Sequence, residues 1–212
     1  MPSTHLRQSV LTAARRIVVK LGTQLLSHAG GKLDLRYIKR MTKQIAALRK
    51  RGFEVTVVSS GAIGAGCAEL GLDKRPRDVA SLQAIAAVGQ RRLMTHLHDA
   101  FATHGLQVGQ VVLTRSDFDD RLRFLNIRNC VTRLHAMDCV PILNENDTVA
   151  VDELRFGDND LLAALTCNAL RADALILLTV VDGLLDEAGN VIDQVGDVTE
   201  MLSVARRDKT KM

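Results

Sequence analysis

Residues suited to holding an anion stand at the end of a short apolar run. Lys20 lies within the run Ile17 to Leu21, and Gly22 follows it directly. A lysine inside a strand is costly to bury unless it meets an anion. A glycine lets the backbone come close to a ligand, and its N–H can donate to a phosphate oxygen. Taken alone, the pair also fits a lysine that extends from a strand end into solvent.

Small residues follow a second apolar run and lead into a predicted helix. They read SSGAIGAG from Ser59 to Gly66 and include the candidate binding residues Ser60 and Gly61. Backbone N–H groups at a helix start, together with the positive end of its dipole, can hold an anion. The G-x-x-G-x-G spacing differs from the dinucleotide fingerprint G-x-G-x-x-G, and no G-K-[ST] follows as in a Walker loop. A tight strand–helix turn that needs small residues for packing is the alternative.

Two further polar clusters complete the set. The first, NEND at 144–147, follows an apolar run directly and could bind both ends of an amino acid, although an Asx-rich turn is the alternative. The second, GDND at 157–160, opens a predicted helix. An aspartate at an N-cap is common, but three such residues in a row exceed what capping needs. One of these carboxylates, placed close to Lys20, would hold its ammonium.

Together these clusters favour phosphoryl transfer to a carboxylate. That reaction needs positioning, positive charge around the moving phosphoryl group, and Mg²⁺ on the nucleotide phosphates. A substrate carboxylate is itself the nucleophile, so no strong base is required, which fits clusters without histidine or cysteine. We expect no protein-held metal site, since the cysteines form no C-x-x-C pair and have no histidines at zinc spacing. We expect four reduced thiols, at Cys67, Cys130, Cys139 and Cys167.

The elements that must position these clusters alternate between strand and helix patterns. Apolar runs predict strands at 17–21, 53–59, 108–113, 139–143 and 174–179. Helical spacing predicts helices from Asp34, from Pro76 to Phe101, from Arg121 to Met137 and from Asp158 to Leu170, with a hairpin arm at 149–156. Unbroken apolar strands separated by helices predict a mostly parallel sheet in a three-layer α/β/α sandwich. Ligands of such sheets bind at the carboxyl ends of the strands, where the polar clusters stand.

Composition limits the alternatives. The 212 residues suffice for one α/β domain, which we place at 15–212 after an N-terminal tail at 1–14. Hydrophobic residues make up 47% and aromatic residues only 3%, so the core must be aliphatic. The net charge of +4 comes without a basic block interleaved with aromatics, which argues against nucleic acid. No signal peptide and no membrane-spanning run is evident, so we expect a soluble cytoplasmic protein.

The motifs resemble those of the amino-acid kinase family. The match runs in order over nearly the whole chain from Arg15 onward. The NEND and GDND pair is its most specific part and separates this sequence from aspartokinases and uridylate kinases. The matching stretches are VVKLGT (18–23), SSGAIGAG (59–66), AAVGQ (86–90), VGQVVLTRSDF (108–118), RFLNIRN (123–129), VPILNENDTVA (140–150), GDND (157–160) and LLTVVDGL (177–184).

The resemblance implies the amino-acid kinase fold and a reaction. ATP, with Mg²⁺, would phosphorylate the side-chain carboxylate of L-glutamate to L-glutamyl 5-phosphate, the first step of proline biosynthesis. Carried over by position, the catalytic residues are Lys20, on the ATP phosphates, and Asp160, which orients Lys20. The residues implied for glutamate are Ser60, Gly61, Asn144, Asp147, Asp158 and Asn159. Those implied for the nucleotide are Lys20, Gly22, Thr179 and Val180.

The resemblance also carries departures and partners. Val180 stands where the family has Asp, and the stretch after Leu184 lacks the usual tyrosine. The family continues beyond the position of Met212 into a GTGGM stretch with a second ATP-binding lysine, so we expect a C-terminally truncated kinase domain. A homo-oligomer, feedback inhibition by proline through the loop 115–124, and transfer of the product to glutamyl phosphate reductase are implied for the family.

Three alternatives stay open. A kinase of another carboxylate or carbamate would share most of these motifs and differ around Asp147 and Asn159. A non-catalytic glutamate-binding or regulatory protein of the same fold is favoured by Val180 and by the lack of the second ATP-binding lysine in this sequence. A Rossmann-type nucleotide-binding module is disfavoured by the glycine spacing.

Overall fold

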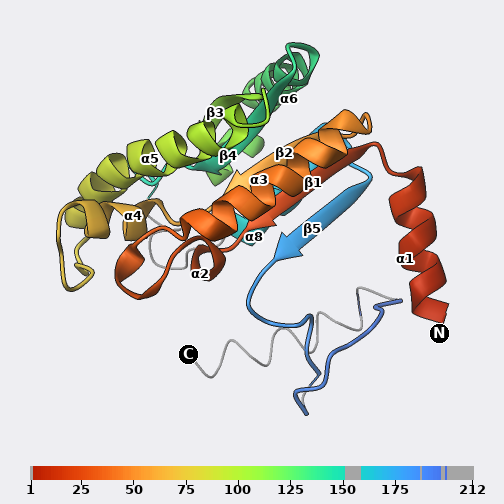
Figure 1. The fold of residues 1–212 in the computed structure, drawn as a ribbon, viewed down its shortest axis with the longest axis horizontal. Helices are drawn as coiled ribbons and strands as arrows, with labels where there is room; N and C mark the ends of the chain where they lie inside the picture. Colours follow the sequence, from red (N-terminus) through yellow and green to blue (C-terminus); the bar gives the residue numbers. More distant parts are fainter. Residues whose placement is uncertain (1, 151–158, 187, 197–198, 200–212) are drawn as a thin grey trace.

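The chain folds around a single parallel sheet. A computed structural model describes residues 2–150, 159–186, 188–196 and 199. Five strands, all paired in parallel, lie in the order β3-β4-β2-β1-β5 (Figure 1). Their bounds are β1 Arg16–Leu21, β2 Glu54–Ser59, β3 Gln107–Leu113, β4 Cys139–Glu145 and β5 Ala174–Leu178. The predicted parallel sheet is confirmed, and each strand lies within two residues of its predicted bounds at either end.

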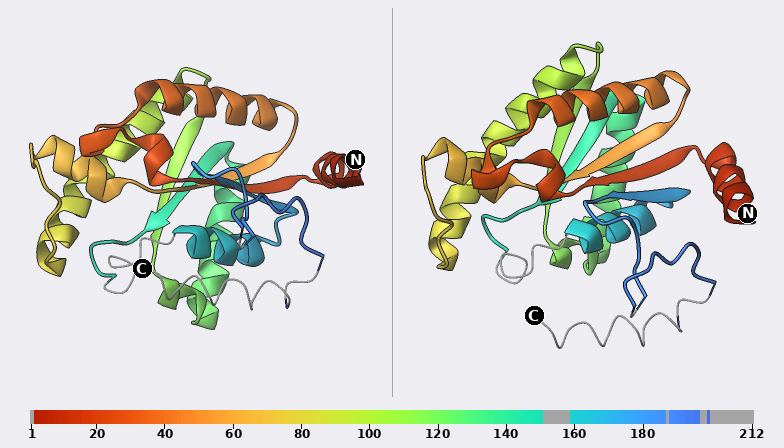
Figure 2. Two further views of the ribbon diagram at one scale, coloured as in Figure 1. Left: turned by 90° about the horizontal axis from the view of Figure 1, so that it is seen from below. Right: turned by 60° about the horizontal axis from the view of Figure 1, so that its bottom comes forward.

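Helices cover both faces of the sheet. Helices α3 (Leu35–Lys50) and α5 (Val79–Ala102) lie on one face, and α6 (Arg121–Ala136) and α8 (Asn159–Leu170) lie on the other, as both views of Figure 2 show. Side chains that alternate along β1 divide between two cores: Val19 packs with the first helix pair and Val18 with the second. The predicted three-layer α/β/α arrangement is confirmed.

Aspartates fix where the long helices begin. The side chains of Asp34, Asp78 and Asp120 each accept a backbone N–H from the first turn of α3, α5 and α6, respectively. The prediction that α5 begins at Pro76 is wrong by three residues, because the Asp78 cap sets the start at Val79. The predicted N-cap Asp158 and most of the predicted hairpin arm at 149–156 lie outside the described residues.

Shorter elements complete the chain. The predicted N-terminal tail forms α1 (Pro2–Ala13), which stands beside the main body in Figures 1 and 2. The turns after the strands hold α2 (Thr23–Leu26), α4 (Ala62–Glu69) and the 3-10 helices η1 (Ala29–Gly31) and η2 (Arg115–Phe118). Helix α4 is the one into which the small residues after β2 were predicted to lead.

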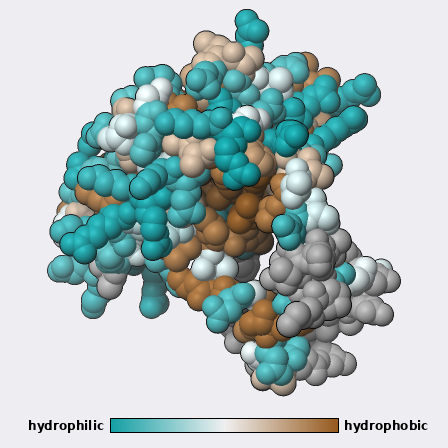
Figure 3. Space-filling model, turned by 45° about the vertical axis from the view of Figure 1, so that its right-hand side comes forward, coloured by the Kyte–Doolittle hydropathy of each residue, from teal (hydrophilic) through white to brown (hydrophobic). Residues whose placement is uncertain are grey.

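One edge of the sheet is apolar and open. Strand β5 ends the sheet order, and among the described residues no strand pairs with its outer side. Leu177 is 46% exposed, and Val180, Val181 and Leu184 after the strand are also exposed. Figure 3 shows apolar side chains gathered on this side of the molecule. No described helix is both long enough and apolar enough to cross a membrane.

A buried histidine joins α6 to β2 and α3 at the end of the sheet opposite the polar clusters. His135 is 9% exposed, and its Nε2 lies 2.9 Å from Oγ1 of the fully buried Thr56. Its Nδ1 lies 3.1 Å from Nη1 of Arg49, which can only donate, so Nδ1 is the acceptor and Nε2 carries the hydrogen. Arg49 also contacts Asp138 at 2.7 Å.

Burial lowers the pKa of His135 to about 4, because the ring is desolvated and the Arg49 guanidinium repels a second positive charge. Arg16 acts in the same direction, whereas Glu54 opposes the shift. The pKa of His135 in the folded state lies below the unfolded value of about 6.5, so folding favours the neutral imidazole over the charged one. The corresponding stability is complete above pH 6.5 and is lost as the pH falls towards 4.

We therefore predict that acidification from pH 7 to pH 4.5 lowers the free energy of unfolding by about 2 kcal/mol through His135 alone. Urea denaturation at a series of pH values measures it. The His135→Gln variant keeps an amide acceptor and donor but cannot titrate, so its pH dependence in this range should be shallower by that amount. Equal slopes for the variant and the wild type would show that His135 does not titrate as proposed.

Candidate functional site

The carboxyl ends of four strands meet the beginning of α8 at one edge of the sheet. Parallel pairing brings these ends together: Leu21 is in register with Ser59 on one side and with Leu178 on the other. Each predicted site residue that the structure describes lies at the end of β1, β2, β4 or β5 or at the start of α8. Asp158 lies outside the described residues.

The side-chain amide of Asn159 joins three of these elements. Its Nδ2 donates towards the Ser59 carbonyl oxygen at 2.9 Å, the Ser60 Oγ at 2.8 Å and the Asn144 Oδ1 at 3.1 Å. One amide with two hydrogens thus connects α8 to β4 and to the turn after β2. The structure therefore brings Ser60, Asn144 and Asn159, which are far apart in the sequence, into one cluster.

Asn144 extends this cluster into the interior. It is 1% exposed, and its Oδ1 also accepts the backbone N–H of Glu145 at 2.9 Å. Its Nδ2 donates to Oε1 of Gln90 on α5 at 2.7 Å. The Asn144 amide is therefore held on both sides, and its oxygen is directed at Asn159.

These residues surround a small cavity, which we call the site cavity. It measures about 90 Å³, the volume of about three water molecules, so it can enclose one end of an amino acid. Ser60 accepts a hydrogen bond from Asn159, which leaves its own hydroxyl hydrogen for an anion. The cavity is lined by Thr23, Ser60, Gly61, Ala62, Ile63, Gly64, Arg75, Asn144, Glu145, Asp147 and Asn159.

The turn after β2 brings backbone N–H groups to the same cavity. Gly61 has φ +97° and precedes α4 as its N-cap, a conformation that favours glycine. Ala65 N is the first to bond within the helix, to Gly61 O at 2.9 Å. The N–H groups of residues 62–64 have no intrahelical acceptor, as at every helix start, and these residues line the cavity. The turn therefore brings the residues of the predicted anion cradle to the cavity, and their binding of an anion stays a prediction.

Close approach of two helices positions this turn. A Cβ added to Gly89 on α5 would overlap the carbonyl oxygen of Ala62, and one added to Gly66 on α4 would overlap that of Ile85. Glycine at both positions lets the two backbones touch. The site turn therefore rests on α5 through a contact that no other residue type permits.

Lys20 and Asp160 form the second half of the site. Lys20 Nζ lies 2.6 Å from Asp160 Oδ1, with the lysine side chain 12% exposed and the aspartate 51% exposed. Lys20 shares the α8-facing side of β1 with Val18, and Asp160 lies in the first turn of α8. The carboxylate holds the ammonium at the end of the strand, as predicted for one member of the GDND cluster.

Gly22 requires a correction. The predicted donation of its N–H to a phosphate is not what the structure shows, because this N–H donates to the Leu178 carbonyl of β5 at 3.0 Å. Its lack of a side chain still matters: a Cβ would lie 3.0 Å from that oxygen and 3.7 Å from Lys20 Nζ. The same Cβ would lie 3.9 Å from the Thr179 Cα, so Gly22 and Thr179 are neighbours. Thr179 and Val180 are both exposed.

Sequence reasoning did not name Thr23, Arg75 or Gln90 as site residues, and of these Arg75 and Gln90 lie outside the stretches that follow the strands. Arg75 lines the cavity from the polar loop before α5, where several basic residues follow one another without a pattern that singles it out. Gln90 lies within the AAVGQ motif, but its contact with Asn144 depends on how α5 packs. No signal in one sequence would have indicated either contact.

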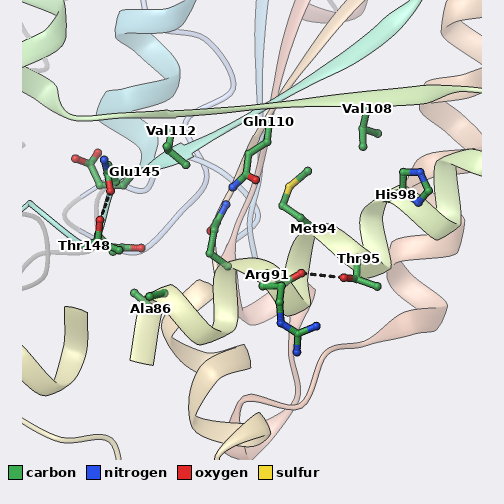
Figure 4. A pocket seen from close by; sticks show the side chains of 14 residues that line it. Ala86, Arg91, Met94, Thr95, His98, Val108, Gln110, Val112, Glu145 and Thr148 are labelled. Carbon is green, nitrogen blue, oxygen red and sulfur yellow. Dashed lines mark hydrogen bonds between the residues drawn. The ribbon is translucent and has the colours of Figure 1, made fainter. Parts of the chain in front are cut away.

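A larger groove adjoins the site cavity. It measures about 780 Å³ and lies between α5 and β3 (Figure 4). Met94 and His98 of α5 face Val108 and Gln110 of β3 across it, and Glu145 stands at one end. The groove shares Glu145 and Asp147 with the site cavity but does not include Lys20, Ser60 or Asn159.

Among the described residues, no three His, Cys, Asp or Glu side chains are grouped so as to hold a metal ion. All four cysteines are free.

Comparison with known proteins identifies relatives over most of the chain. Residues 15–208 match the profile of the amino acid kinase family. The chain is 51% identical over 179 residues to the glutamate 5-kinase of Chromohalobacter salexigens, covering 84% of this chain and 47% of that protein. It is 44% identical over 203 residues to the glutamate 5-kinase of Citrifermentans bemidjiense, covering 93% and 54%. The chain thus spans about half the length of the curated relatives it matches.

The contact between α4 and α5 gives a test of how the site is positioned. Alanine is a better helix former than glycine by about 1 kcal/mol, so propensity alone predicts that Gly89→Ala stabilises. We predict instead a loss of about 2–4 kcal/mol, because the added methyl overlaps the Ala62 carbonyl. Gly196→Ala, at a glycine where an added Cβ meets no atom of the described residues within 4 Å, is the control. Thermal and urea denaturation measure both; an equally stable Gly89→Ala protein would contradict the proposed contact.

Proposed function

Because the chain belongs to the amino acid kinase family, we propose that the protein phosphorylates the side-chain carboxylate of L-glutamate with ATP. The products are L-glutamyl 5-phosphate and ADP, and the reaction opens proline biosynthesis. The observation that carries the proposal is the cluster of Ser60, Asn144 and Asn159 beside the Lys20–Asp160 pair. The glutamate 5-kinase relatives support it.

The acceptor half of the site suits an amino acid. The Ser60 hydroxyl and the N–H groups at the start of α4 are donors for a carboxylate of glutamate. Asp147 lines the same cavity and offers a carboxylate to the substrate ammonium. The side-chain N–H groups of Asn159 donate to protein acceptors, so its Oδ1 is the atom that can accept a hydrogen bond from the ligand. Gly61 and Asn144 belong to the same half by their positions, and the family resemblance assigns Asp158 to it.

The transfer step needs positive charge more than a base. An oxygen of the ionised glutamate side chain attacks the γ-phosphorus of ATP, the bond to the β,γ-bridging oxygen breaks, and ADP leaves with the electron pair. No proton has to move. Lys20 neutralises charge on the phosphates, and Asp160 fixes its ammonium. Mg²⁺ would arrive bound to the nucleotide phosphates. Gly22, Thr179 and Val180 face the nucleotide.

The proposal also covers the assembly, regulation, product transfer and location of the protein. We include a homo-oligomer, feedback inhibition by proline and transfer of the reactive acyl phosphate to glutamyl phosphate reductase. A cytoplasmic location is supported by the four free cysteines, which suit a reducing compartment.

A second candidate is a glutamate-binding protein without catalysis. The exposed side chain of Val180, 55% accessible, favours it, because the nucleotide half offers few enclosed contacts there. The two candidates differ in one result: the second binds glutamate but releases no ADP from Mg-ATP.

We predict that L-glutamate is phosphorylated in preference to L-aspartate and N-acetylglutamate. Aspartate is one methylene too short to reach both ends of the site, and N-acetylglutamate lacks the ammonium that Asp147 would bind. Steady-state ADP release with each acceptor, and trapping of the acyl phosphate by hydroxylamine, measure the preference. Equal or greater turnover of either rival would refute the substrate assignment, and glutamate binding without turnover would favour the second candidate.

We further predict that Lys20→Ala lowers turnover by about 10²–10³-fold while changing glutamate affinity far less, because the lysine acts on charge that develops in the transition state. Calorimetry with glutamate and single-turnover kinetics separate the two effects. Lys43→Ala, at an exposed position of α3, is the matched control and should leave both values unchanged. A Lys20→Ala protein with altered glutamate affinity and normal turnover would rule out this role.

A further inference from the structure

Among the described residues, Gln90 is the one side chain of α5 that joins the acceptor half of the site by a hydrogen bond between side chains. Its Oε1 accepts from Asn144 Nδ2 at 2.7 Å, and Asn144 Oδ1 in turn faces Asn159 Nδ2 at 3.1 Å. Asn159 then reaches Ser60 Oγ at 2.8 Å. Three amides and a hydroxyl thus form a continuous series of hydrogen bonds from α5 to the site cavity.

The series has a fixed direction. Asn144 Oδ1 must point towards the Glu145 and Asn159 N–H groups, so its Nδ2 must point the other way, at Gln90. Asn144 is 1% exposed, and a buried Nδ2 without an acceptor costs the desolvation of that group. The oxygen of Gln90 satisfies it. Rotation of the Asn144 amide would instead set two donors, Asn144 Nδ2 and Asn159 Nδ2, against each other.

The second polar atom of the Gln90 side chain, Nε2, does not explain why a glutamine stands at this position. Its buried Nε2 has no hydrogen-bond partner among the described residues. A glutamine kept only for packing would gain nothing from a buried, unpaired N–H, and an apolar residue would fill the same space without that cost. The polar atom that matters at this position is therefore Oε1.

We propose that Gln90 is a positioning residue for glutamate: by accepting from Asn144 it holds Asn159 and Ser60 in the orientation that binds the substrate. The inference rests on the proposed function and adds a residue to it. Lys20 and Asp160 have no part in this series of hydrogen bonds, so Gln90 acts on glutamate binding and leaves the nucleotide half unaffected.

The test compares two glutamines of the same helix. Gln90→Met keeps the length of the side chain and removes the acceptor. Gln83→Met makes the same chemical change on α5, at a residue that lines neither the site cavity nor the groove. We expect Gln90→Met to weaken glutamate binding about tenfold to a hundredfold in calorimetric titration, the range typical of a buried donor left unpaired. Mg-ATP binding should stay within about twofold, and Gln83→Met should match the wild type for both ligands.

A double-mutant cycle tests the route. If Gln90 acts through Asn144, Gln90→Met should have no further effect on glutamate affinity in a protein that already carries Asn144→Ala. Additive losses would overturn the proposal. So would unchanged glutamate affinity in Gln90→Met, or equal losses for glutamate and Mg-ATP, which indicate a packing role. Should Gln90→Met fail to fold, Gln90→Asn replaces it: the amide stays polar but is withdrawn from Asn144, and the same selective loss is expected.

Failure of this inference differs from failure of the proposed function. If the wild-type protein binds no glutamate, both the proposed function and the role of Gln90 are refuted. A wild-type protein that binds glutamate, with a Gln90→Met variant that binds it equally well, removes the role of Gln90 alone.

Discussion

The arrangement of the site depends on how α8 begins. Its first residue, Asn159, donates to β2 and β4 partners, and its second, Asp160, holds the Lys20 ammonium of β1 at 2.6 Å. The side chains of successive helical residues point about 100° apart, so neighbouring residues in one turn can contact strands on different sides of the helix. Shifting α8 by a single residue would turn both side chains by about 100° in the same sense and separate both sets of contacts. The helix is kept in place by the apolar side chains that pack it against β1 and β2.

The sheet supplies the other constraint. Because all five strands run in parallel, every carboxyl end reaches the same edge, and residues from distant parts of the chain meet there. Alternation along β1 then decides which face each side chain takes. Lys20 shares the face of Val18 and meets α8, whereas Val19 and Leu21 pack towards α3 and α5. The partly buried Lys20 is tolerated because it is the last residue but one of β1 and because its ammonium pairs with the Asp160 carboxylate.

The elements could be predicted because their signals are local. Apolar runs and helical spacing located the strands and long helices, and the clusters after the strands located the site edge. Contacts that depend on packing could not be predicted. The sequence predicts a free N–H at Gly22 for a phosphate, yet this N–H donates to the Leu178 carbonyl of β5. Gln90 occupies a helix position like many others, and only the close approach of α4 and α5 through Gly66 and Gly89 brings that helix near the site.

The two halves of the site are built differently, and this bears on how they work. The acceptor half is enclosed: Ser60 and Asn144 are buried, and their polar atoms are fixed by hydrogen bonds before any ligand arrives. Preorganised donors and acceptors lose little entropy on binding and discriminate strongly between ligands that do and do not satisfy them. The half that we propose for the nucleotide comprises, among the described residues, the Lys20–Asp160 ion pair and exposed residues after β5. Under the proposed function, selectivity for the acceptor would therefore reside in the hydrogen-bonded cluster, whereas Lys20 would contribute mainly positive charge while the phosphoryl group is transferred.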